Sequence, residues 1–580
     1  MKQELNIPLF ISRSRTTTEA NKTGAWRFMR PGYAEKTAPC GAACPAGEDI
    51  ARIQLLTAAG KTGEAWETIL RENPFPAVCG RVCFHPCQGV CNRSGFDDTV
   101  SIRPVERFLG DAALQQSRSA APLRPAAGKR VAVVGAGPAG LSAAYFLAML
   151  GYGCDVFEAA GQAGGLLRWG IPRYRLPEDV LDAEIRRIVD LGVKIYTGKP
   201  ATEPFLDEIA ASYDALFLGC GLGRSIPLKI PGEELARDGL SFLRDLQGPD
   251  ACARVRKAAI IGGGNTAVDL ARSLKRMGAE PVIVYRRRRE DMPAFGQEAE
   301  MALDEGVRLM ELTAPVRIDE TERGCRLTLQ PMKMAGTGPD GRARVVPDGD
   351  ATQSLDVEAV FTAIGASPAG EWLMPSESEP GAIRMAHCML IQRRLPTVFG
   401  GDLTNAVQSV ADAIASGKEG AMALDTLFRE DADKVADRLA GCRVGSGSSL
   451  SMDIYLGGAR GQRAAHEVAF DEVNTAYFSP SVRKRPAVLS PAERVRSFEE
   501  VEGGLSEGDA AAEAARCFNC GICNDCDNCR LFCPEVAVMR NESGGGAESR
   551  RILYDYCKGC GICVTECPRN AMDLTVEEGI

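Results

Sequence analysis

Two runs of cysteine near the C-terminal end constrain this chain more than any other feature. The first run holds six cysteines and the second holds four, and each closes on a Cys-Pro pair. The last four of the first run and all four of the second share the spacing C-x2-C-x2-C-x3-C-P, in which three thiolates bind one [4Fe-4S] cluster and the fourth binds its neighbour. The runs therefore predict two clusters, held by Cys523, Cys526, Cys529 and Cys567 and by Cys533, Cys557, Cys560 and Cys563.

Two other uses of cysteine fit these runs less well. A disulfide framework is typical of secreted chains, and the first 25 residues lack the apolar core of a secretion signal. Zinc ligands usually come as separated C-x2-C pairs. The 22 cysteines therefore indicate metal ligation in a reducing cytoplasm, and the clusters indicate a protein that transfers single electrons.

Length and charge limit the remaining possibilities. A chain of 580 residues has room for several domains. A net charge of -9 and a pI of 5.3 argue against a nucleic-acid binder, whose binding surface would be basic. No apolar run reaches the roughly 18 residues that a membrane-spanning helix needs. We therefore expect a cytoplasmic protein without a nucleic-acid partner or a membrane span.

An apolar strand at 131–134 runs into a glycine-rich turn and a helix. The turn reads G-x-G-x-x-G, whose glycines let the backbone and the helix N-terminus approach a pyrophosphate. The next strand ends in an acid, Glu158, at the place where a carboxylate binds an adenosine ribose. These features predict a dinucleotide site that includes Gly135, Gly137, Pro138, Ala139, Gly140 and Glu158.

A second strand, turn and helix of this kind begins at Ala258. Its following strand ends in four arginines instead of an acid, and arginine at this place can bind the 2′-phosphate of NADP(H). A solvated basic loop is the alternative interpretation of the arginine run. The predicted nicotinamide-nucleotide site comprises Gly262, Gly263, Gly264, Asn265, Thr266 and Ala267, with Arg286 and Arg287 on the phosphate.

Two dinucleotide sites beside iron-sulfur clusters call for a flavin as well as a nicotinamide. A nicotinamide gives up two electrons as a hydride, whereas each cluster takes one electron, and a flavin can do both. No catalytic acid or base is needed for this chemistry. The three histidines form no cluster in the sequence, so we assign them no role.

Several motifs between residues 30 and 440 carry a resemblance to a known family. These residues resemble the small subunit of NAD(P)H-dependent glutamate synthase, the amino-terminal half of dihydropyrimidine dehydrogenase and the flavin subunit of NADH-dependent ferredoxin:NADP oxidoreductase. With its ferredoxin-like tail, the whole chain is similar to the iron-sulfur flavoproteins that serve dissimilatory sulfite reductase, benzoyl-CoA reductase or 2-oxoacid oxidoreductases. The motifs lie at Cys79–Cys83, Gly164–Pro177, Gly262–Ala267, Tyr285–Arg287, Met292–Pro293, Thr362–Gly365 and Gly400–Asp402.

The resemblance implies FAD in the first site and NAD(P)H in the second. It places Glu158 on the FAD ribose, Asp402 near the ribityl phosphate, and a helix beginning near Val410 with its N-terminus toward the isoalloxazine, where the helix dipole favours a reduced flavin. A helix N-cap is the alternative role for Asp402. Further cofactor contacts implied by the resemblance are Gly165, Leu166, Arg168, Ala363, Ile364, Gly365 and Gly401.

The N-terminal cysteines depart from the family pattern. The family carries two clusters there, and here the upstream C-x2-C pair is missing, while Cys83 and Cys87 stand two residues closer together than in the relatives. Glu106 falls where a relative uses a glutamine ligand. By this resemblance Cys44, Cys83, Cys87 and Glu106 hold one [4Fe-4S] cluster, and Cys79 is a packed thiol in a tight turn, although spacing alone would count Cys79 as a ligand.

Cys40 and Cys91 remain as half of a second cluster. In the relatives the missing pair sits in a helix that ends in Arg-Cys-x2-Cys-Gly, and this chain has that pattern at Arg516–Gly521. We therefore expect a second N-terminal cluster held by Cys40, Cys91, Cys517 and Cys520. The alternatives are that Cys517 and Cys520 are spare thiols or that the tail uses other ligands from its crowded run.

The expected fold is multidomain. It combines an α-helical iron-sulfur domain, two α/β Rossmann-like domains with the NAD(P) domain inserted in the FAD domain, and an α+β ferredoxin-like domain. The expected boundaries are 1–127 for the helical domain, 128–250 and 359–440 for the FAD domain, 251–358 for the NAD(P)H domain, 441–515 for a linker and 516–580 for the ferredoxin-like domain.

The expected function is an NAD(P)H:acceptor oxidoreductase that passes electrons through FAD and several [4Fe-4S] clusters to a one-electron protein acceptor. It would act as a subunit or docking partner of a larger redox enzyme, in a hetero-oligomer or as a homodimer. A free-standing NAD(P)H:ferredoxin oxidoreductase is the first alternative. A non-enzymatic electron-transfer or scaffold subunit is the second, and the intact glycines of both sites argue against it.

Overall fold

A computed structural model describes residues 22–246, 255–338, 341, 343–541 and 549–577. The chain forms two compact units. The main unit comprises Cys40–Gly461 and Ser481–Cys517, and the terminal unit comprises Met1–Pro39, Gln462–Pro480 and Phe518–Ile580. Cys252 lies outside the described residues.

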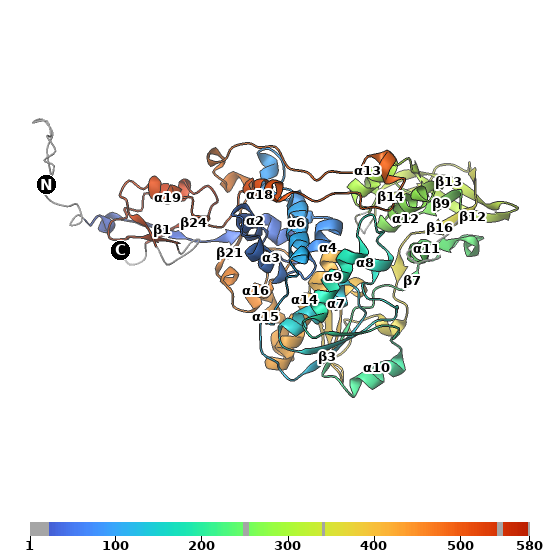
Figure 1. Cartoon of the computed structure of the whole chain (residues 1–580), viewed down its shortest axis with the longest axis horizontal. Coiled ribbons are helices and arrows are strands. Elements are labelled where there is room, and N and C mark those ends of the chain that lie inside the picture. The colour runs from blue at the N-terminus through green and yellow to red at the C-terminus, as the bar shows by residue number, and fades with distance from the viewer. Residues whose placement is uncertain (1–21, 247–254, 339–340, 342, 542–548, 578–580) are drawn as a thin grey trace, which may run out of the picture. The chain divides into compact units, whose positions relative to one another are not determined.

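The first Rossmann-like sheet of the main unit has seven strands in the order β18-β19-β20-β6-β3-β4-β5. Strands β20, β6, β3, β4 and β5 run parallel, so their carboxyl ends share one edge. Helices α7 and α14 pack beside each other against this sheet, near β3 (Figure 1). The bounds are β3 Arg130–Val134, β4 Gly153–Phe157, β5 Lys194–Tyr196, β6 Ala215–Leu218, β18 Ala382–Arg384, β19 Met389–Ile391, β20 Thr397–Phe399, α7 Pro138–Met149, α8 Leu166–Trp169, α9 Glu178–Val189, α10 Glu203–Ala210 and α14 Val410–Arg429.

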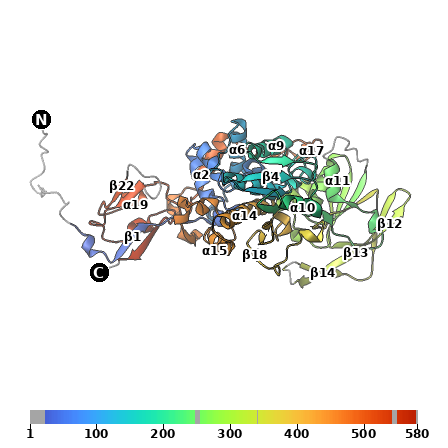
Figure 2. The same ribbon diagram turned by 90° about the horizontal axis from the view of Figure 1, so that it is seen from below.

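The second Rossmann-like sheet lies between β6 and β18 in the sequence, and its strand order is β11-β10-β9-β16-β8. All its neighbouring strands are parallel. A four-stranded antiparallel sheet adjoins it, and Figure 2 shows its strands together at one edge of the main unit. The bounds are β8 Arg237–Asp238, α11 Gly239–Leu246, β9 Lys257–Ile261, α12 Asn265–Arg276, β10 Glu280–Val284, α13 Gly296–Asp304, β11 Arg308–Met310, β12 Thr313–Thr321, β13 Gly324–Thr337, β14 Ala343–Pro347, β15 Gln353–Val357 and β16 Ala359–Thr362.

A helical layer precedes the first sheet in the sequence. Its helices are α1 Pro39–Ala43, α2 Ile50–Ala58, α3 Thr62–Leu70, α4 Pro76–Val82, α5 Pro86–Gly89 and α6 Ile102–Gln115. The layer joins the rest of the main unit through α14, because Lys418 Nζ donates to Glu72 Oε2 at 2.6 Å, and both side chains are at most 2% exposed. A buried lysine needs such a partner to stay charged.

The terminal unit contains the predicted ferredoxin-like segment and two parts of the chain that were not expected there. Strand β1 (Met29–Tyr33) pairs antiparallel with β24 (Met572–Val576), and β2 (Lys36–Thr37) pairs parallel with β21 (Ala464–Glu467). Part of the segment expected as a helical domain, 1–127, therefore forms strands that pair with strands far along the chain. The sequence did not predict them, because a strand that pairs only with a distant edge leaves no local periodicity. The remaining elements are β22 Val538–Arg540, β23 Arg550–Ile552, α19 Asn528–Leu531 and α20 Ile562–Thr565.

The segment expected as a linker, 441–515, is hydrogen-bonded to distant parts of the chain at several points, although most of its residues between 461 and 500 are exposed. It includes α16 (Met452–Tyr455), α17 (Pro491–Arg494) and α18 (Glu507–Ala515). Residues 487–503 form a short hairpin, in which Leu489 N donates to Val501 O and Gly503 N donates to Ala487 O. The hairpin is bonded to the first Rossmann-like domain, because Val501 N donates to Tyr174 O at 2.9 Å. The polar composition of the segment predicted a flexible loop. The long-range hydrogen bonds instead hold the segment in a defined conformation.

Helices α4 and α6 cross so closely that glycine is required on both. A Cβ at Gly80 would lie 2.4 Å from Arg107 Cα, and a Cβ at Gly110 would lie 2.4 Å from Ala77 N. Real Cβ atoms do not approach backbone atoms at such distances, so a larger residue would push the helices apart. Because α4 ends at Cys83 and α6 carries Glu106, this crossing sets the distance between two predicted cluster ligands.

We predict that Gly110→Ala lowers the free energy of unfolding by about 1–3 kcal/mol, the usual cost of overpacking, and reduces the iron content. Thermal unfolding and iron analysis of the purified protein would measure both effects. Gly89→Ala is the matched control, since a Cβ there meets no atom within 4 Å. A normal iron content and stability in Gly110→Ala would contradict the role given to the crossing.

Candidate functional site

The first glycine-rich turn has the backbone of a dinucleotide site. Gly135 follows β3 with a φ of +98°, and a Cβ there would lie 2.5 Å from Gly219 O, so this position needs glycine. Gly137 is the N-cap of α7, whose first turn therefore presents free N–H groups beyond the strand end. Glu158 is buried, and its carboxylate accepts from Ala136 N at 2.7 Å and from Ala160 N at 2.8 Å. The acid is thereby fixed beside the turn.

Residues 164–168 close over this turn. Gly164 N donates to Ala136 O at 2.8 Å, and a Cβ at Gly165 would lie 2.7 Å from Gly137 Cα. Arg168 is buried, and its guanidinium donates to Ala163 O at 2.6 Å and pairs with Asp182, while its Nη1 has no partner among the described residues. Leu166 is exposed. Arg168 thus holds the loop in shape and keeps one donor available.

The second half of the predicted flavin site lies at the strand end of β20. Gly401 has a φ of +66°, and its N–H donates to Ser416 Oγ at 2.7 Å. Burial raises the pKa of Asp402 to about 6, and the charge of Asp412 adds to the shift. Helix α14 begins at Val410, and its N-cap is Ser409, whose Oγ accepts from Asp412 N at 3.1 Å. Asp402 is therefore not the N-cap of α14, which leaves its carboxylate for another role.

Helix α14 approaches α7 closely enough to align the two helix N-termini at the same sheet edge. A Cβ at Gly417 would lie 2.4 Å from Ala139 O and 2.7 Å from Ala143 N. Ser142 Oγ donates to Ile414 O at 2.8 Å, which fixes the register of the pair. Two helix N-termini at one edge create a positive region suited to a pyrophosphate and to a reduced flavin. These residues fit FAD.

The second glycine-rich turn is built on the same principle. Gly262 follows β9 with a φ of +145°, and a Cβ there would lie 2.2 Å from Ala363 O. A Cβ at Gly263 would lie 2.5 Å from the ring of Tyr285. Gly264 is the N-cap of α12, which begins at Asn265. The predicted residues Gly262, Gly263, Gly264, Asn265, Thr266, Ala267, Ala363, Ile364 and Gly365 thus surround the strand ends of β9 and β16.

The four arginines after β10 differ in what they contact. Arg287 Nε donates to Ala343 O at 2.6 Å, and Arg288 pairs with Asp291 at 2.9 Å. Arg289 lies 3.8 Å from Glu300. Arg286 is exposed and makes no ion pair within the described part of the chain. Of the two arginines predicted to bind a phosphate, Arg286 is therefore the one whose guanidinium is available.

The structure brings Cys44, Cys83, Cys87 and Glu106 together in one cavity of the main unit, which has an empty volume of about 400 Å³ and is also lined by Cys79. Burial raises the pKa of Cys83 to about 12, so a thiolate at this place needs the positive charge of iron. Asn73 Nδ2 donates to Glu106 Oε1 at 3.1 Å, which orients the carboxylate. Three thiols and one carboxylate around a cavity fit a [4Fe-4S] cluster.

Cys79 differs from its expected setting. It lies within α4 and is 3% exposed, where a tight turn was expected. Because its thiol lines the cavity beside the predicted ligands, packing and ligation both fit its position.

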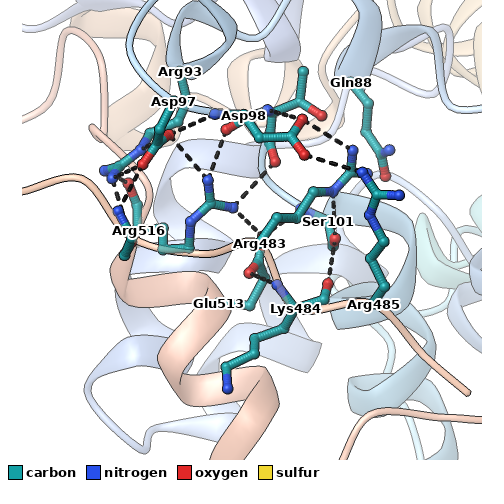
Figure 3. A network of polar contacts seen from close by, with 12 residues as sticks. Gln88, Arg93, Asp97, Asp98, Ser101, Arg483, Lys484, Arg485, Glu513 and Arg516 are labelled. Carbon is teal, nitrogen blue, oxygen red and sulfur yellow. Dashed lines mark hydrogen bonds and ion pairs between the residues drawn. The ribbon is translucent and has the colours of Figure 1, made fainter.

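The remaining predicted N-terminal ligands divide between the units. Cys40, Cys91 and Cys517 belong to the main unit, and Cys520 belongs to the terminal unit. The chain near Cys91 and Cys517 is held by one polar network, in which Arg93 donates to Arg516 O and pairs with Asp97 at 2.6 Å (Figure 3). Arg516 also pairs with Asp97, at 3.0 Å. Burial opposes ionisation of Asp97, but hydrogen bonds from Arg93 and Ser481 N hold its pKa well below the usual range.

The same network fixes the residues after Ser481. Glu513 accepts from Ser101 N at 2.8 Å and from Lys484 N at 2.6 Å (Figure 3). Ser101 Oγ donates to Lys484 O at 2.6 Å. The composition of this segment does not predict the network. The bonds that join it to residues 97–101 connect positions about 380 to 420 residues apart.

Each C-terminal cysteine set lines its own cavity in the terminal unit. Cys523, Cys526, Cys529 and Cys567 line the first, and Cys533, Cys557, Cys560 and Cys563 line the second. The cavities have empty volumes of about 370 and 360 Å³. Four thiols spaced around a cavity suit a cubane cluster. Among the described residues, no three His, Cys, Asp or Glu side chains converge as they would on a single metal ion.

Backbone and side-chain donors complete these two sites. Ala537 N donates to Cys533 Sγ and Ala571 N donates to Cys567 Sγ, both at 3.3 Å, so the two Cys-Pro-x-x-Ala turns repeat the same bond. Tyr33 Oη lies 3.2 Å from Cys529 Sγ. Hydrogen bonds to cluster sulfurs stabilise the reduced state and so raise the reduction potential. Tyr33 was not foreseen as a site residue, since it lies 496 residues from Cys529.

His85 is a second residue that the sequence did not single out. It follows Cys83 with a φ of +45°, and its N–H donates to Cys83 Sγ at 3.3 Å. Burial lowers the pKa of His85 to about 4, and the charge of Arg103 adds to the shift, so the ring is neutral at pH 7. The ring packs edge-on against that of Phe295, with centroids 5.1 Å apart.

Comparison with known proteins identifies the architecture. The family model for pyridine nucleotide-disulphide oxidoreductase matches residues 129–417. The model for dihydropyrimidine dehydrogenase domain II, 4Fe-4S cluster, matches 13–118, and that for the 4Fe-4S binding domain matches 551–573. The beta subunit of NADP(+)-dependent formate dehydrogenase from Moorella thermoacetica is 34% identical over 521 residues, which cover 83% of this chain and 70% of that one.

This chain belongs to the pyridine nucleotide-disulphide oxidoreductase family. Two further relatives match a smaller share of this chain. The beta subunit of NADPH-Fe(3+) oxidoreductase from Geobacter sulfurreducens is 37% identical over 57% of this chain and 51% of its own length. The PreT subunit of NAD-dependent dihydropyrimidine dehydrogenase from Escherichia coli is 33% identical over 67% of this chain and 90% of its own length.

These matches confirm that the chain is an NAD(P)H oxidoreductase that uses FAD and [4Fe-4S] clusters. They also confirm the resemblance and a fold that contains Rossmann-type dinucleotide-binding domains. In the described part of the chain, no helix is both long and apolar enough to cross a membrane. Which residues bind each cluster, and how many clusters the chain holds, remain predictions.

We predict that Tyr33→Phe lowers the midpoint potential of the cluster assigned to Cys529 by about 30–60 mV, the equivalent of a three- to tenfold change in a one-electron equilibrium. The reason is the loss of one donor to the thiolate. An EPR-monitored redox titration would measure the shift. Tyr554→Phe is a suitable control, because its hydroxyl donates to Pro31 O and not to a cysteine. An unchanged potential in Tyr33→Phe would contradict the assignment.

Proposed function

We propose that this chain is the electron-transferring subunit of a larger redox enzyme, in which it passes electrons between NADPH and a one-electron protein partner. One observation carries the proposal. The cavity of Cys44, Cys83, Cys87 and Glu106 is also lined by Ala411, which lies in the first turn of α14. The helix N-terminus predicted to face the flavin therefore forms part of the wall of the first cluster cavity.

The protein's contribution is positioning. When bound, FAD accepts a hydride from a nicotinamide and exchanges electrons singly with clusters. The residues of α7 and α14 would hold its pyrophosphate and isoalloxazine, and the turn before α12 would hold the nucleotide so that the two rings stack. The cysteines of the terminal unit would serve as the site of exchange with the partner. Relatives named as subunits of formate dehydrogenase and dihydropyrimidine dehydrogenase support a partner for this chain.

We assign the preference for NADPH to Arg286. Its guanidinium is exposed and free of ion pairs in the described residues, and it stands at the place where an arginine binds a 2′-phosphate. The names of two relatives specify NADP(+) or NADPH, which agrees with this assignment.

We predict that Arg286→Ala raises the KM for NADPH about 10- to 100-fold and leaves that for NADH almost unchanged, because a hydrogen bond to a charged group contributes about 1.5–3 kcal/mol. Steady-state reduction of a small one-electron dye would give both constants. Arg288→Ala is the matched control, since Arg288 pairs with Asp291. Equal effects on NADPH and NADH would refute the assignment.

We also propose four [4Fe-4S] clusters. Two would be bound by the C-terminal sets and one by Cys44, Cys83, Cys87 and Glu106. The fourth set, Cys40, Cys91, Cys517 and Cys520, rests on the sequence pattern, and the network of Arg93, Asp97 and Arg516 supports the two members that it holds in place.

We predict about sixteen irons per chain, four for each cluster. Iron analysis with EPR on the anaerobically purified chain would count them, and twelve or fewer would remove the fourth set. Cys517→Ala should then lower the count by about four, whereas Cys442→Ala, a buried thiol outside every predicted set, should leave it unchanged.

A free-standing NADPH:ferredoxin oxidoreductase is the second candidate, and the ferredoxin-like terminal unit favours it as a docking site. Affinity purification under native conditions separates the two. A stoichiometric redox partner supports the subunit, and its absence together with rapid reduction of ferredoxin would replace that proposal with the second candidate.

A further inference from the structure

The loop between Cys83 and Cys87 carries a strained histidine. His85 has a φ of +45°, a conformation that L-residues rarely adopt and that persists only where the surroundings hold it. Its backbone N–H donates to Cys83 Sγ at 3.3 Å, and its ring Nδ1 lies 3.2 Å from Cys83 O. The conformation of His85 therefore determines the donor that Cys83 receives.

The other side of the contact belongs to the nucleotide site. Phe295 immediately precedes α13, and its N–H donates to Asn265 Oδ1 at 2.8 Å. The residue before it, Ala294, donates its N–H to Gly263 O at 3.2 Å. Gly263 and Asn265 form the turn predicted to bind the pyrophosphate of NAD(P)H. The position of Phe295 therefore follows the position of this turn.

The two rings join these sites. The His85 and Phe295 rings meet edge-on, with an interplanar angle of 85° and centroids 5.1 Å apart. Edge-to-face pairs of this kind hold their partners in a defined geometry. A continuous path of contacts thus runs from the nucleotide turn through Phe295 and His85 to Cys83.

We propose that His85 is a positioning residue that couples nucleotide binding at the Gly262–Ala267 turn to reduction of the cluster held by Cys83, an inference that rests on the proposed function. Ordering of the turn by a nucleotide moves or fixes Phe295, which changes the N–H bond that His85 donates to Cys83 Sγ. Hydrogen bonds to cluster sulfurs tune the potential. By thermodynamic linkage, reduction of the cluster then changes nucleotide affinity by the same factor.

The coupling can be measured on the intact holoprotein with 2′-phospho-ADP-ribose, which carries the phosphates of NADP but cannot accept a hydride. The EPR-monitored midpoint potential of this cluster, assigned by loss of its signal in Cys83→Ser, is compared with and without a saturating concentration of the probe. We expect a shift equivalent to about fivefold in affinity, or about 40 mV for one electron at 59 mV per tenfold.

Four variants test the path. Phe295→Ala and His85→Ala remove one ring each and should reduce the shift to less than a third. Phe295→Tyr and His85→Phe keep two aromatic rings in contact and should retain it. His466→Ala is the matched control, because His466 pairs with Glu472 in the terminal unit.

Each outcome decides the proposal. An equal shift in all variants, or no shift in the unsubstituted protein, overturns it. Calorimetric titration of the probe provides a separate check on the proposed function. If the probe does not bind or the protein has no iron-sulfur signal, the proposed function fails together with the coupling. If the probe binds and the signal is present, but the potential shift is the same with and without the two rings, the coupling alone fails.

Discussion

The close packing of α14 on α7 is the constraint on which the rest of the main unit depends. At Gly417 the helices are so near that a Cβ would overlap Ala139 O, and this contact sets where the first turn of α14 ends up. That turn lies at the sheet edge predicted to bind FAD and contributes Ala411 to the cavity of Cys44, Cys83, Cys87 and Glu106. Further along, Lys418 anchors the helical layer through Glu72. The contact at Gly417 thus fixes α14, and α14 contributes to the predicted flavin site, to the predicted cluster cavity and to the interface with the helical layer.

Buried ion pairs hold the second Rossmann-like domain to the first. Arg175 pairs with Asp269 on α12 at 2.7 Å and with Glu298 on α13 at 3.3 Å, and all three side chains are at most 11% exposed. The ring of Tyr174 lies 3.8 Å from the guanidinium carbon of Arg276. Removing one partner from a buried pair costs far more than the pair contributes. The orientation of this domain is therefore specified by charge, and the contact between Phe295 and His85 joins the same domain to the helical layer.

Local rules predict the strand-and-turn elements that carry the candidate sites. Gly135, Gly262 and the two C-terminal cysteine sets follow from spacing along a few residues, because strand, turn and helix impose short-range geometry on the chain. Contacts between distant polar segments could not be predicted in this way. Tyr33 reaches Cys529 across a strand pairing, and Glu513 bonds to Ser101 through a segment whose composition resembles a linker. The arginine run follows β10, as its place in the sequence predicted, but only tertiary contacts separate Arg286 from its neighbours.

The loop between Cys83 and Cys87 shows how a short spacing between two predicted cluster ligands acquires structural meaning. With three residues between the two thiols, the chain must turn sharply, and His85 takes a positive φ to do so. The turn then points the His85 N–H at Cys83 Sγ and its ring at Phe295. The strained backbone of His85 thus accompanies a series of contacts that connects a predicted cluster ligand to the turn predicted to bind the nucleotide.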